Sequence, residues 1–278
     1  MKIHWKFKST VFAFIDLFSL QRLLYFIQKH VTGRSRIVAL NINENWKRHE
    51  DALKKYNANK LLLEFGAGQN LAQNLYLSST VDKQVVVDLN PMLDVDLSDT
   101  ARKLLSSQIY FRSNKEINSP TDLTTYGIEY RAPFDVSNTD FETGSFDASI
   151  STNTLEHIPE ESIVKIFKEL HRILRKKGIV SAKIDYTDHY AHTDSSITLL
   201  NYLHFSDLEW KKFNHNCHYQ NRLRHYDYLR IFEACKFKIV EEEIVFEEKN
   251  IPTAIIKKYA DKPKSWAATS AYILLMKD

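Results

Sequence analysis

Several residue types that define whole classes of protein are scarce in this chain. Its 278 residues include two cysteines, Cys217 and Cys235, and no C-x-x-C pair, which excludes a disulfide framework and favours free thiols. Six glycines and six prolines leave no long flexible linker. A net charge of +3 is too small to predict nucleic acid as a partner, since such proteins usually present a concentrated basic face.

Long apolar runs are missing as well. The most hydrophobic stretch, residues 11–27, spans 17 residues and contains Asp16, Gln21 and Arg22, whereas a membrane span needs roughly 20 apolar residues. We therefore expect a helix that packs on the domain or on a partner protein. Peripheral contact with a membrane is the alternative, because lysines and arginines flank the stretch. No convincing cleavable signal is present, so the expected location is the cytoplasm, with membrane association left open.

What is present is an ordinary globular composition with alternating strands and helices. Apolar residues make up 44% and charged residues 26%. Amphipathic segments predict helices, one of them over 160–177 with Gly178 as its C-terminal cap. The alternation predicts an α/β fold with a doubly wound, mostly parallel, seven-stranded sheet. The expected strands are 60–65, 84–88, 127–131, 145–151, 179–184, 237–244 and 271–276.

The same pattern divides the chain. Residues 1–42 hold the apolar helix and a connector, and residues 43–278 form one domain. The segment at about 185–222 has no clear periodicity, and six of the 11 histidines lie between His189 and His225. We expect this segment to be an irregular cap inserted after the fifth strand, on the side where a substrate would bind.

The most informative segment is Leu61–Asn70, LLLEFGAGQN. A buried strand that runs into a turn with Gly66 and Gly68 lets the backbone approach a ligand closely, and the next helix offers its N-terminal amides. Asp88 ends the following strand, where a carboxylate can accept both ribose hydroxyls of a nucleotide-like ligand. Together these residues predict an adenosine-containing ligand at the carboxyl edge of the sheet.

Two phosphate-binding patterns fail in this segment. A dinucleotide fingerprint needs a third glycine where Leu71 stands, and a P-loop needs Gly-Lys-Ser/Thr, whereas Gly68 is followed by Gln69 and Asn70. An acid beside the turn, Glu64, disfavours pyrophosphate and favours a cofactor with a cationic part, such as a sulfonium.

At this point the sequence resembles the class I S-adenosylmethionine-dependent methyltransferases, over roughly residues 55–185. Residues 64–68, EFGAG, are similar to the first motif of that family, with Asn70 in place of its last glycine, and residues 145–159 resemble its fourth-strand motif. The resemblance implies a Rossmann-like methyltransferase fold with S-adenosylmethionine as cofactor. It implies that Asp88 binds the ribose, that Leu89 and Asp135 contact the adenine, and that Asn153 lies near the methionine part. The full set of cofactor-binding residues that it implies is Glu64, Phe65, Gly66, Gly68, Asp88, Leu89, Asp135 and Asn153.

The cap supplies the candidates for catalysis. Methyl transfer needs an acceptor aligned with the methyl group, and a hydroxyl acceptor must also lose its proton, which suits a histidine. His189, with Asp188 as its orienting carboxylate, is the first candidate base, and His192 is the second. The alternative is that these residues only pack the cap. We expect no metal, because neither H-E-x-x-H nor paired cysteines occur, although Asp and His side chains can bind divalent cations.

The acceptor is less well indicated. Aromatic residues of the cap, among them Tyr186, Tyr190, Tyr202 and Trp210, could line a sugar site or form the core of the cap. The stretch 201–237 resembles the corresponding region of methyltransferases encoded beside enzymes of polysaccharide biosynthesis. This resemblance implies an O-methyltransferase for a sugar hydroxyl of a polysaccharide or glycan-lipid intermediate. The alternatives are a small-molecule or lipid acceptor, a catalytically silent interaction domain, and an NAD-dependent oxidoreductase, which Leu71 disfavours.

Overall fold

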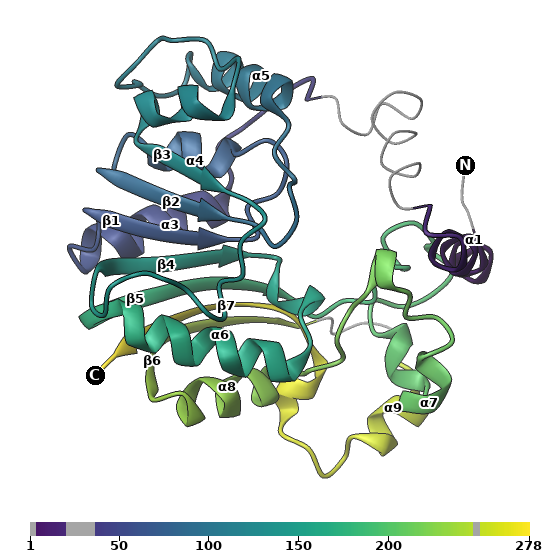
Figure 1. The fold of residues 1–278 in the computed structure, drawn as a ribbon. Helices are drawn as coiled ribbons and strands as arrows, with labels where there is room; N and C mark the ends of the chain where they lie inside the picture. The colour runs from purple at the N-terminus through teal and green to yellow at the C-terminus, as the bar shows by residue number, and fades with distance from the viewer. Residues whose placement is uncertain (1–3, 21–36, 247–250) are drawn as a thin grey trace.

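The computed structural model describes residues 4–20, 37–246 and 251–278. Within them seven strands form one sheet in the order β3-β2-β1-β4-β5-β7-β6 (Figure 1). The predicted fold class, a Rossmann-like seven-stranded sheet with flanking helices, is confirmed. The strands are β1 Leu61–Phe65, β2 Lys83–Val87, β3 Ile128–Arg131, β4 Phe146–Thr152, β5 Leu174–Asp185, β6 Phe237–Phe246 and β7 Ala268–Lys277.

The order of the strands determines where a ligand can bind. β1 lies between β2 and β4, β3 extends the sheet beyond β2, β5 extends it beyond β4, and all of these pairs are parallel. β7 lies between β5 and β6 and runs antiparallel to both. The carboxyl ends of the five parallel strands therefore meet at one edge. In such sheets ligands bind outside this edge, where the strand order reverses beside the first strand.

Helices cover both faces of the sheet, because alternate residues of each strand point to opposite sides. Leu63 and Phe65 of β1 belong to the core on the face that α6 and α8 cover. Leu62 belongs to the core on the opposite face, which α3, α4 and α5 cover. Figure 1 shows α6 and α8 together on one face. The bounds of the five helices are α3 Glu44–Lys55, α4 Ala72–Leu77, α5 Val95–Leu105, α6 Glu160–Ile173 and α8 His225–Ala234.

Helix α6 ends four residues earlier than its periodicity predicts. Leu174 already pairs with Phe146 of β4, so the chain has entered β5 before Gly178 is reached. Gly178 is therefore not a helix cap. A Cβ atom at this position would lie 2.8 Å from the carbonyl oxygen of Arg175 and 3.0 Å from that of Asp147. The glycine permits close backbone packing at the start of the strand.

The cap after β5 contains only short helices and has an apolar core of its own. Trp5 from α1 (Trp5–Leu17) and Ile255 from α9 (Thr253–Lys258) complete this core. Its other fully buried members include Tyr190, Leu200, Tyr202, Leu203 and Trp210. The short helices of the cap are η3 Asn201–His204, α7 Asp207–Trp210 and η4 Asn216–His218, and those elsewhere are η1 Pro120–Tyr126, η2 Leu155–His157 and η5 Lys264–Ala267.

Helix α1 packs on the cap of the same chain, as Figure 1 shows. The Trp5 side chain is buried, its backbone N–H donates a 2.8 Å hydrogen bond to Asp194, and its ring lies 4.9 Å from that of Phe213. The hydroxyl of Ser9 lies 2.9 Å from Nε2 of His215. The structure thus shows the expected packing on the domain for the first part of the apolar stretch; residues 21–27 lie outside the described residues. None of the described helices has the length and apolar character needed to span a bilayer.

Candidate active site

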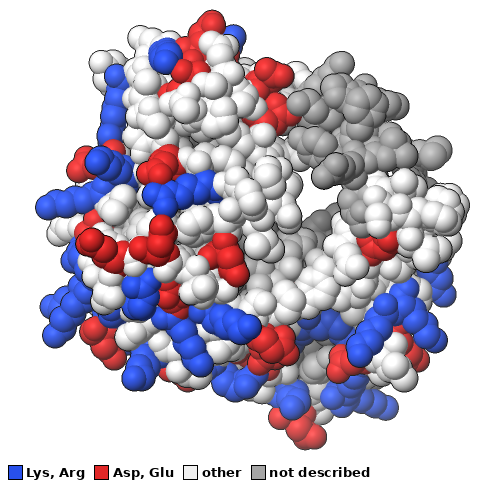
Figure 2. Space-filling view, viewed as in Figure 1, with Lys and Arg blue, Asp and Glu red and all other residues white. Residues whose placement is uncertain are grey.

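A cavity of about 550 Å³ lies at the carboxyl edge of the sheet. Its walls come from the loops that follow β1, β2, β3 and β4 and from one side of α6. A concave site of this size holds a nucleoside-sized molecule. Figure 2 shows a hollow on this face, and the described residues at its border are mainly uncharged, while lysines, arginines and acids mix over the rest of the face.

The turn after β1 brings the backbone to the wall of this cavity. Gly66 and Gly68 both have positive φ angles, +74° and +77°. A Cβ atom at Gly66 would lie 2.2 Å from the Cγ2 atom of Thr154, whereas one at Gly68 would meet nothing within 4 Å. Gly66 is therefore required by the fold, and Gly68 keeps a stretch of the cavity wall free of side chains. Leu71, which stands where a dinucleotide fingerprint has its third glycine, also has a positive φ, 45°. The backbone is therefore left-handed at this position although the residue is not a glycine.

Asp88 lies at the end of β2 with its carboxylate at the cavity. The hydroxyl of Tyr130 donates a 3.0 Å hydrogen bond to one carboxylate oxygen. Burial raises the pKa of Asp88 to about 6, although that hydroxyl and the backbone amides of Ala67 and Gly68 lower it in part. The glycine turn thus faces the carboxylate directly. A ligand with a pair of adjacent hydroxyl groups would find its acceptor here.

Most of the other residues predicted to bind the cofactor also border the cavity. Phe65 lies at its floor, and Leu89 is 67% exposed on its rim. Asp135 is exposed and accepts a 2.8 Å hydrogen bond from the backbone N–H of Ser137. Asn153 lines the cavity with a φ of 50°, in the loop after β4. The structure therefore brings these residues together around one space.

Glu64 is the exception among the predicted cofactor residues, since it does not line the cavity. Its carboxylate is buried and accepts hydrogen bonds from Gln73 at 2.8 Å and Asn74 at 2.6 Å. Burial raises the pKa of Glu64 to about 8, against the opposite effect of these two amides. The acid therefore ties β1 to α4 instead of presenting a negative charge to a ligand.

The histidines predicted to act in catalysis lie beside the cavity, with a different acidic partner from the one expected. The carboxylate of Asp188 is fully buried and accepts hydrogen bonds from the side chain of Asn201 and the backbone N–H of Tyr190, both at 2.8 Å. It holds the cap together and does not orient His189. This corrects the sequence prediction: successive side chains diverge in this turn, and the local hydrogen bonds occupy Asp188.

Asp185 takes the place that was predicted for Asp188. Its Oδ2 atom lies 3.6 Å from Nε2 of His189 and 3.7 Å from Nε2 of His192. Burial acts to raise the pKa of Asp185, but the contact with His189 and the hydrogen bonds from Thr187 outweigh it and lower the pKa. An ionised carboxylate therefore lies next to both candidate bases.

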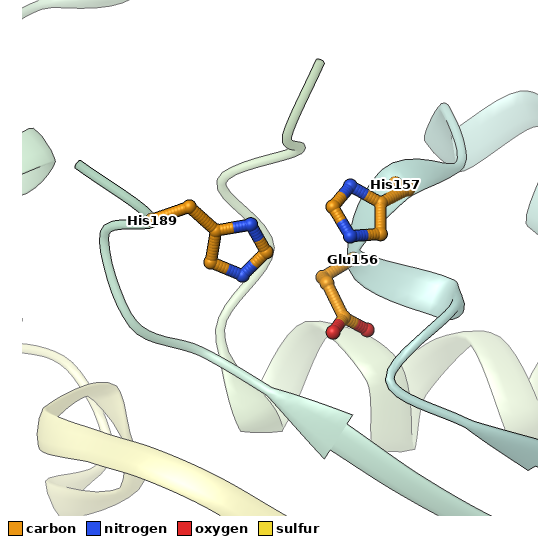
Figure 3. A group of neighbouring side chains, drawn as sticks. All are labelled: Glu156, His157 and His189. Carbon is orange, nitrogen blue, oxygen red and sulfur yellow. The ribbon is translucent and has the colours of Figure 1, made fainter. Parts of the chain in front are cut away.

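Two residues that were not predicted complete this side of the cavity. His157 lines the cavity, and the centre of its ring lies 4.9 Å from that of His189. Its Nδ1–H donates a 2.8 Å hydrogen bond to the carbonyl of Tyr219. Glu156 lies beside it, 2% exposed, and Figure 3 shows its carboxyl group close to both rings. The sequence held a signal for both residues: Glu156 and His157 are consecutive in the segment that follows the fourth strand, so an acid and an imidazole lie together near the end of a strand.

The aromatic residues considered for a sugar site are buried: Tyr190, Tyr202 and Trp210 belong to the core of the cap, and Tyr186 belongs to the core of the sheet beside α8. Tyr186, Tyr190, Tyr202 and Trp210 are all at most 3% exposed. The guanidinium group of Arg224 is buried among them and donates a hydrogen bond to the carbonyl of Tyr186. Of the two interpretations of these side chains, the structure favours the packed cap.

Part of this chain is similar to known methyltransferases. Residues 63–182 match the family model described as a methyltransferase domain. No curated protein matches the sequence. Among solved structures, a SAM-dependent methyltransferase from Methanosarcina mazei matches with a TM-score of 0.52 and 16% identity, covering 86% of this chain and 99% of that one.

Two further solved structures match at lower identity. The [4+2]-cyclase SpnF matches with a TM-score of 0.51 and 12% identity over 97% of this chain and 96% of that one. A geranyl diphosphate C-methyltransferase from Streptomyces coelicolor matches with a TM-score of 0.48 and 12% identity, over 84% and 78% of the two chains. The similarity to solved structures shows the fold, which does not by itself determine the reaction.

The family match supports methyltransferase activity and implies S-adenosylmethionine as the cofactor. The cavity fits this molecule. The turn at Gly66 and Gly68 allows a close approach of the backbone, Asp88 offers an acceptor for ribose hydroxyls, and apolar side chains such as Leu89 and Phe134 border the place for a flat base.

Proposed function

We propose that this protein transfers the methyl group of S-adenosylmethionine to a hydroxyl oxygen of an acceptor that enters beside His157 and His189. The observation that carries the proposal is that the glycine turn, Asp88 and His157 line one cavity. The ring of His189, from the cap, lies next to His157, with 4.9 Å between the ring centres.

The residues of the first set hold the cofactor. Asp88 accepts the ribose hydroxyls, Leu89 and Asp135 contact the adenine, and Asn153 lies toward the methionine part. When bound, S-adenosylmethionine supplies an electrophilic methyl carbon, whose bond to sulfur breaks with its electron pair returning to sulfur as the acceptor oxygen forms the new bond. The protein must chiefly align the oxygen with that carbon and keep water out.

The residues of the second set handle the proton of the acceptor. We propose that His189 accepts this proton at an imidazole nitrogen and that the neighbouring carboxylate of Asp185 stabilises the resulting imidazolium. His192, which the same carboxylate contacts, is half-exposed and provides a route for the proton to solvent.

We propose a sugar hydroxyl as the acceptor, on a glycan intermediate attached to a membrane lipid. The outer face of α1 supports the membrane part of this proposal. Phe7, Val11, Phe14 and Phe18 are 40–64% exposed and follow one another at spacings of four, three and four residues, so they form one stripe along the helix. Lys2 precedes the helix in the sequence and Lys6 lies in its first turn, which suits an anionic lipid surface.

The cofactor is tested first, by calorimetric titration of the full chain with S-adenosylhomocysteine and, separately, with NADH. Binding of S-adenosylhomocysteine alone is expected. Binding of NADH alone would contradict the cofactor, and binding of neither would favour a silent domain.

The base is tested by turnover, with methyl-labelled S-adenosylmethionine and a panel of lipid-linked and soluble sugars. His189→Ala should lower turnover by about 100-fold, because general-base catalysis contributes roughly that much or more, while the affinity for S-adenosylhomocysteine stays unchanged. Asp185→Asn should have a smaller effect in the same direction. His204→Ala is the control, since it removes an exposed histidine of the cap. Full activity of His189→Ala would return the histidines to a structural role.

A further inference from the structure

The cluster formed by Glu156, His157 and His189 has the composition of a metal site. Each residue offers one ligand atom, and the three atoms lie within 4.8 Å of one another (Figure 3). An ion that binds each ligand at about 2.1 Å holds its ligands roughly 3 to 4 Å apart, so small side-chain movements close this cluster on a cation.

The carboxyl group of Glu156 is the second, independent observation. The residue is 2% exposed, and neither carboxylate oxygen is paired with another side chain in the described part of the chain. Burying an acid without such a partner is costly, because the ionised form loses its hydration. A cation is the partner that this carboxylate lacks.

The two imidazoles are prepared for the same role. The Nδ1–H of His157 is donated to the carbonyl of Tyr219, so Nε2 keeps its lone pair, and this orientation of a ring by a backbone carbonyl is typical of metal-binding histidines. Nε2 of His189 is buried and makes no hydrogen bond in the described part of the chain. Oδ2 of Asp185 lies 3.6 Å from the same nitrogen, so a second carboxylate lies next to the cluster.

We infer that Glu156, His157 and His189 bind a divalent first-row transition metal ion beside the cofactor cavity. Two imidazoles and one carboxylate leave open positions on such an ion and favour it over Mg²⁺ or Ca²⁺, which prefer oxygen ligands. Because His157 lines the cavity, an open position faces the place where the acceptor enters.

The inference deepens the proposed function, on which its consequence for catalysis rests. An oxygen bound to a cation loses its proton more easily, as metal-bound water does. His189 then acts as a ligand instead of the base, and the proton of the acceptor hydroxyl leaves to solvent through His192, which is half-exposed.

The test is a binding measurement that needs no acceptor. The full chain is treated with EDTA, freed of chelator and titrated with Co²⁺, whose visible absorption reports nitrogen and carboxylate ligation, and then with Zn²⁺ in competition. One Co²⁺ per chain is expected. Glu156→Gln and His189→Ala should each weaken binding by at least tenfold, since even supporting residues of metal sites contribute that much. His204→Ala should bind as the unmodified chain does.

Two further measurements make the result decisive. Binding of S-adenosylhomocysteine by each variant shows that the cofactor half is folded, so a lost metal site is not confused with unfolding or with failure of the proposed function. Equal Co²⁺ affinity in all variants, or no binding by the unmodified chain, overturns the inference. Turnover that survives EDTA would also restore His189 as the base, whereas loss of turnover with recovery on adding Zn²⁺ or Mn²⁺ supports the ligand role.

Discussion

Gly66 is a glycine that the fold requires at the wall of the candidate cofactor cavity. Its backbone has a positive φ, and the space where a Cβ atom would lie is filled by the side chain of Thr154 from the loop after β4. Gly68 has nearly the same φ with open space around it. The two glycines of the motif therefore differ in what a substitution should cost.

We predict that Gly66→Ala lowers the free energy of unfolding by more than about 2 kcal/mol, since the left-handed conformation costs roughly 1–2 kcal/mol and the overlap with Thr154 adds to it. Gly68→Ala should cost only about 1 kcal/mol in stability but weaken binding of S-adenosylhomocysteine. Urea denaturation and calorimetry measure the two effects. The double variant Gly66→Ala/Thr154→Ala should recover part of the lost stability; no recovery would contradict the steric explanation.

Asp88 makes cofactor binding depend on pH. Its pKa is raised by burial to about 6, from an ordinary value of 3.8, so the carboxylate is protonated below about pH 6 in the free protein. We predict that the affinity for S-adenosylhomocysteine is constant above pH 7 and falls below pH 6, because a neutral carboxyl group cannot accept two ribose hydroxyls. Calorimetry across this range measures the effect, and Asp88→Asn should remove the step. Asp140→Asn, at an exposed acid, should keep it.

The same group acts on stability with the opposite sign. A raised pKa means that burial disfavours the ionised form in the folded state. The contribution of Asp88 to the free energy of unfolding is therefore fully present below about pH 4 and is lost as the pH rises through about 6. As the pH rises through about 6, the free energy of unfolding should therefore decrease while the affinity for S-adenosylhomocysteine increases.

The sequence predicted the positions of residues whose place depends on a strand–turn unit. Gly66, Gly68, Asp88 and Asn153 all follow strands at one edge of the sheet, and the structure places them around one cavity. The prediction failed at Asp188, because adjacency in the sequence does not tell which way a side chain points in an irregular turn. Glu64 was misjudged for a related reason: its partners Gln73 and Asn74 come from the next helix.

Among the elements, α1 has two unlike faces. One face carries Trp5 and Ser9 into contact with the cap, and the opposite stripe of Phe7, Phe14 and their neighbours is exposed. Asp16, one of the polar residues that interrupt the apolar stretch, accepts a hydrogen bond from the backbone N–H of Cys217 and so belongs to the cap-facing side.

We predict that Phe7→Ser combined with Phe14→Ser lowers co-sedimentation of the protein with vesicles containing anionic lipid by about tenfold or more, because burial of a Phe side chain in an apolar phase contributes about 1.5–3 kcal/mol. Affinity for S-adenosylhomocysteine should not change. Tyr110→Ser is the matched control, since Tyr110 is 89% exposed and lies far along the chain from α1. If the control reduces sedimentation as much as the double variant does, α1 has no special role at the membrane.

At the scale of the whole molecule, the sheet was predictable and the cap was not. Each parallel strand corresponds to a short apolar run followed by a turn in the sequence. These runs alone were enough to predict a parallel sheet. The cap depends instead on contacts such as that between Trp5 and Asp194, which are 189 residues apart in the sequence. Periodicity within a segment cannot reveal partners at that distance.

The core of the cap is built from α1, the segment after β5 and a C-terminal segment that includes α9 and η5, and this has a consequence for the order of folding. The five parallel strands that carry the cofactor residues are complete once residue 185 has been made, and they pair with one another without the C-terminal segment. The cap needs Ile255 from the end of the chain. During synthesis on the ribosome, which proceeds from the N-terminus, the cofactor half can therefore assemble while the wall that meets the acceptor is still unfinished. A chain cut short before α9 would keep the nucleotide-binding strands and lack a finished place for the second substrate.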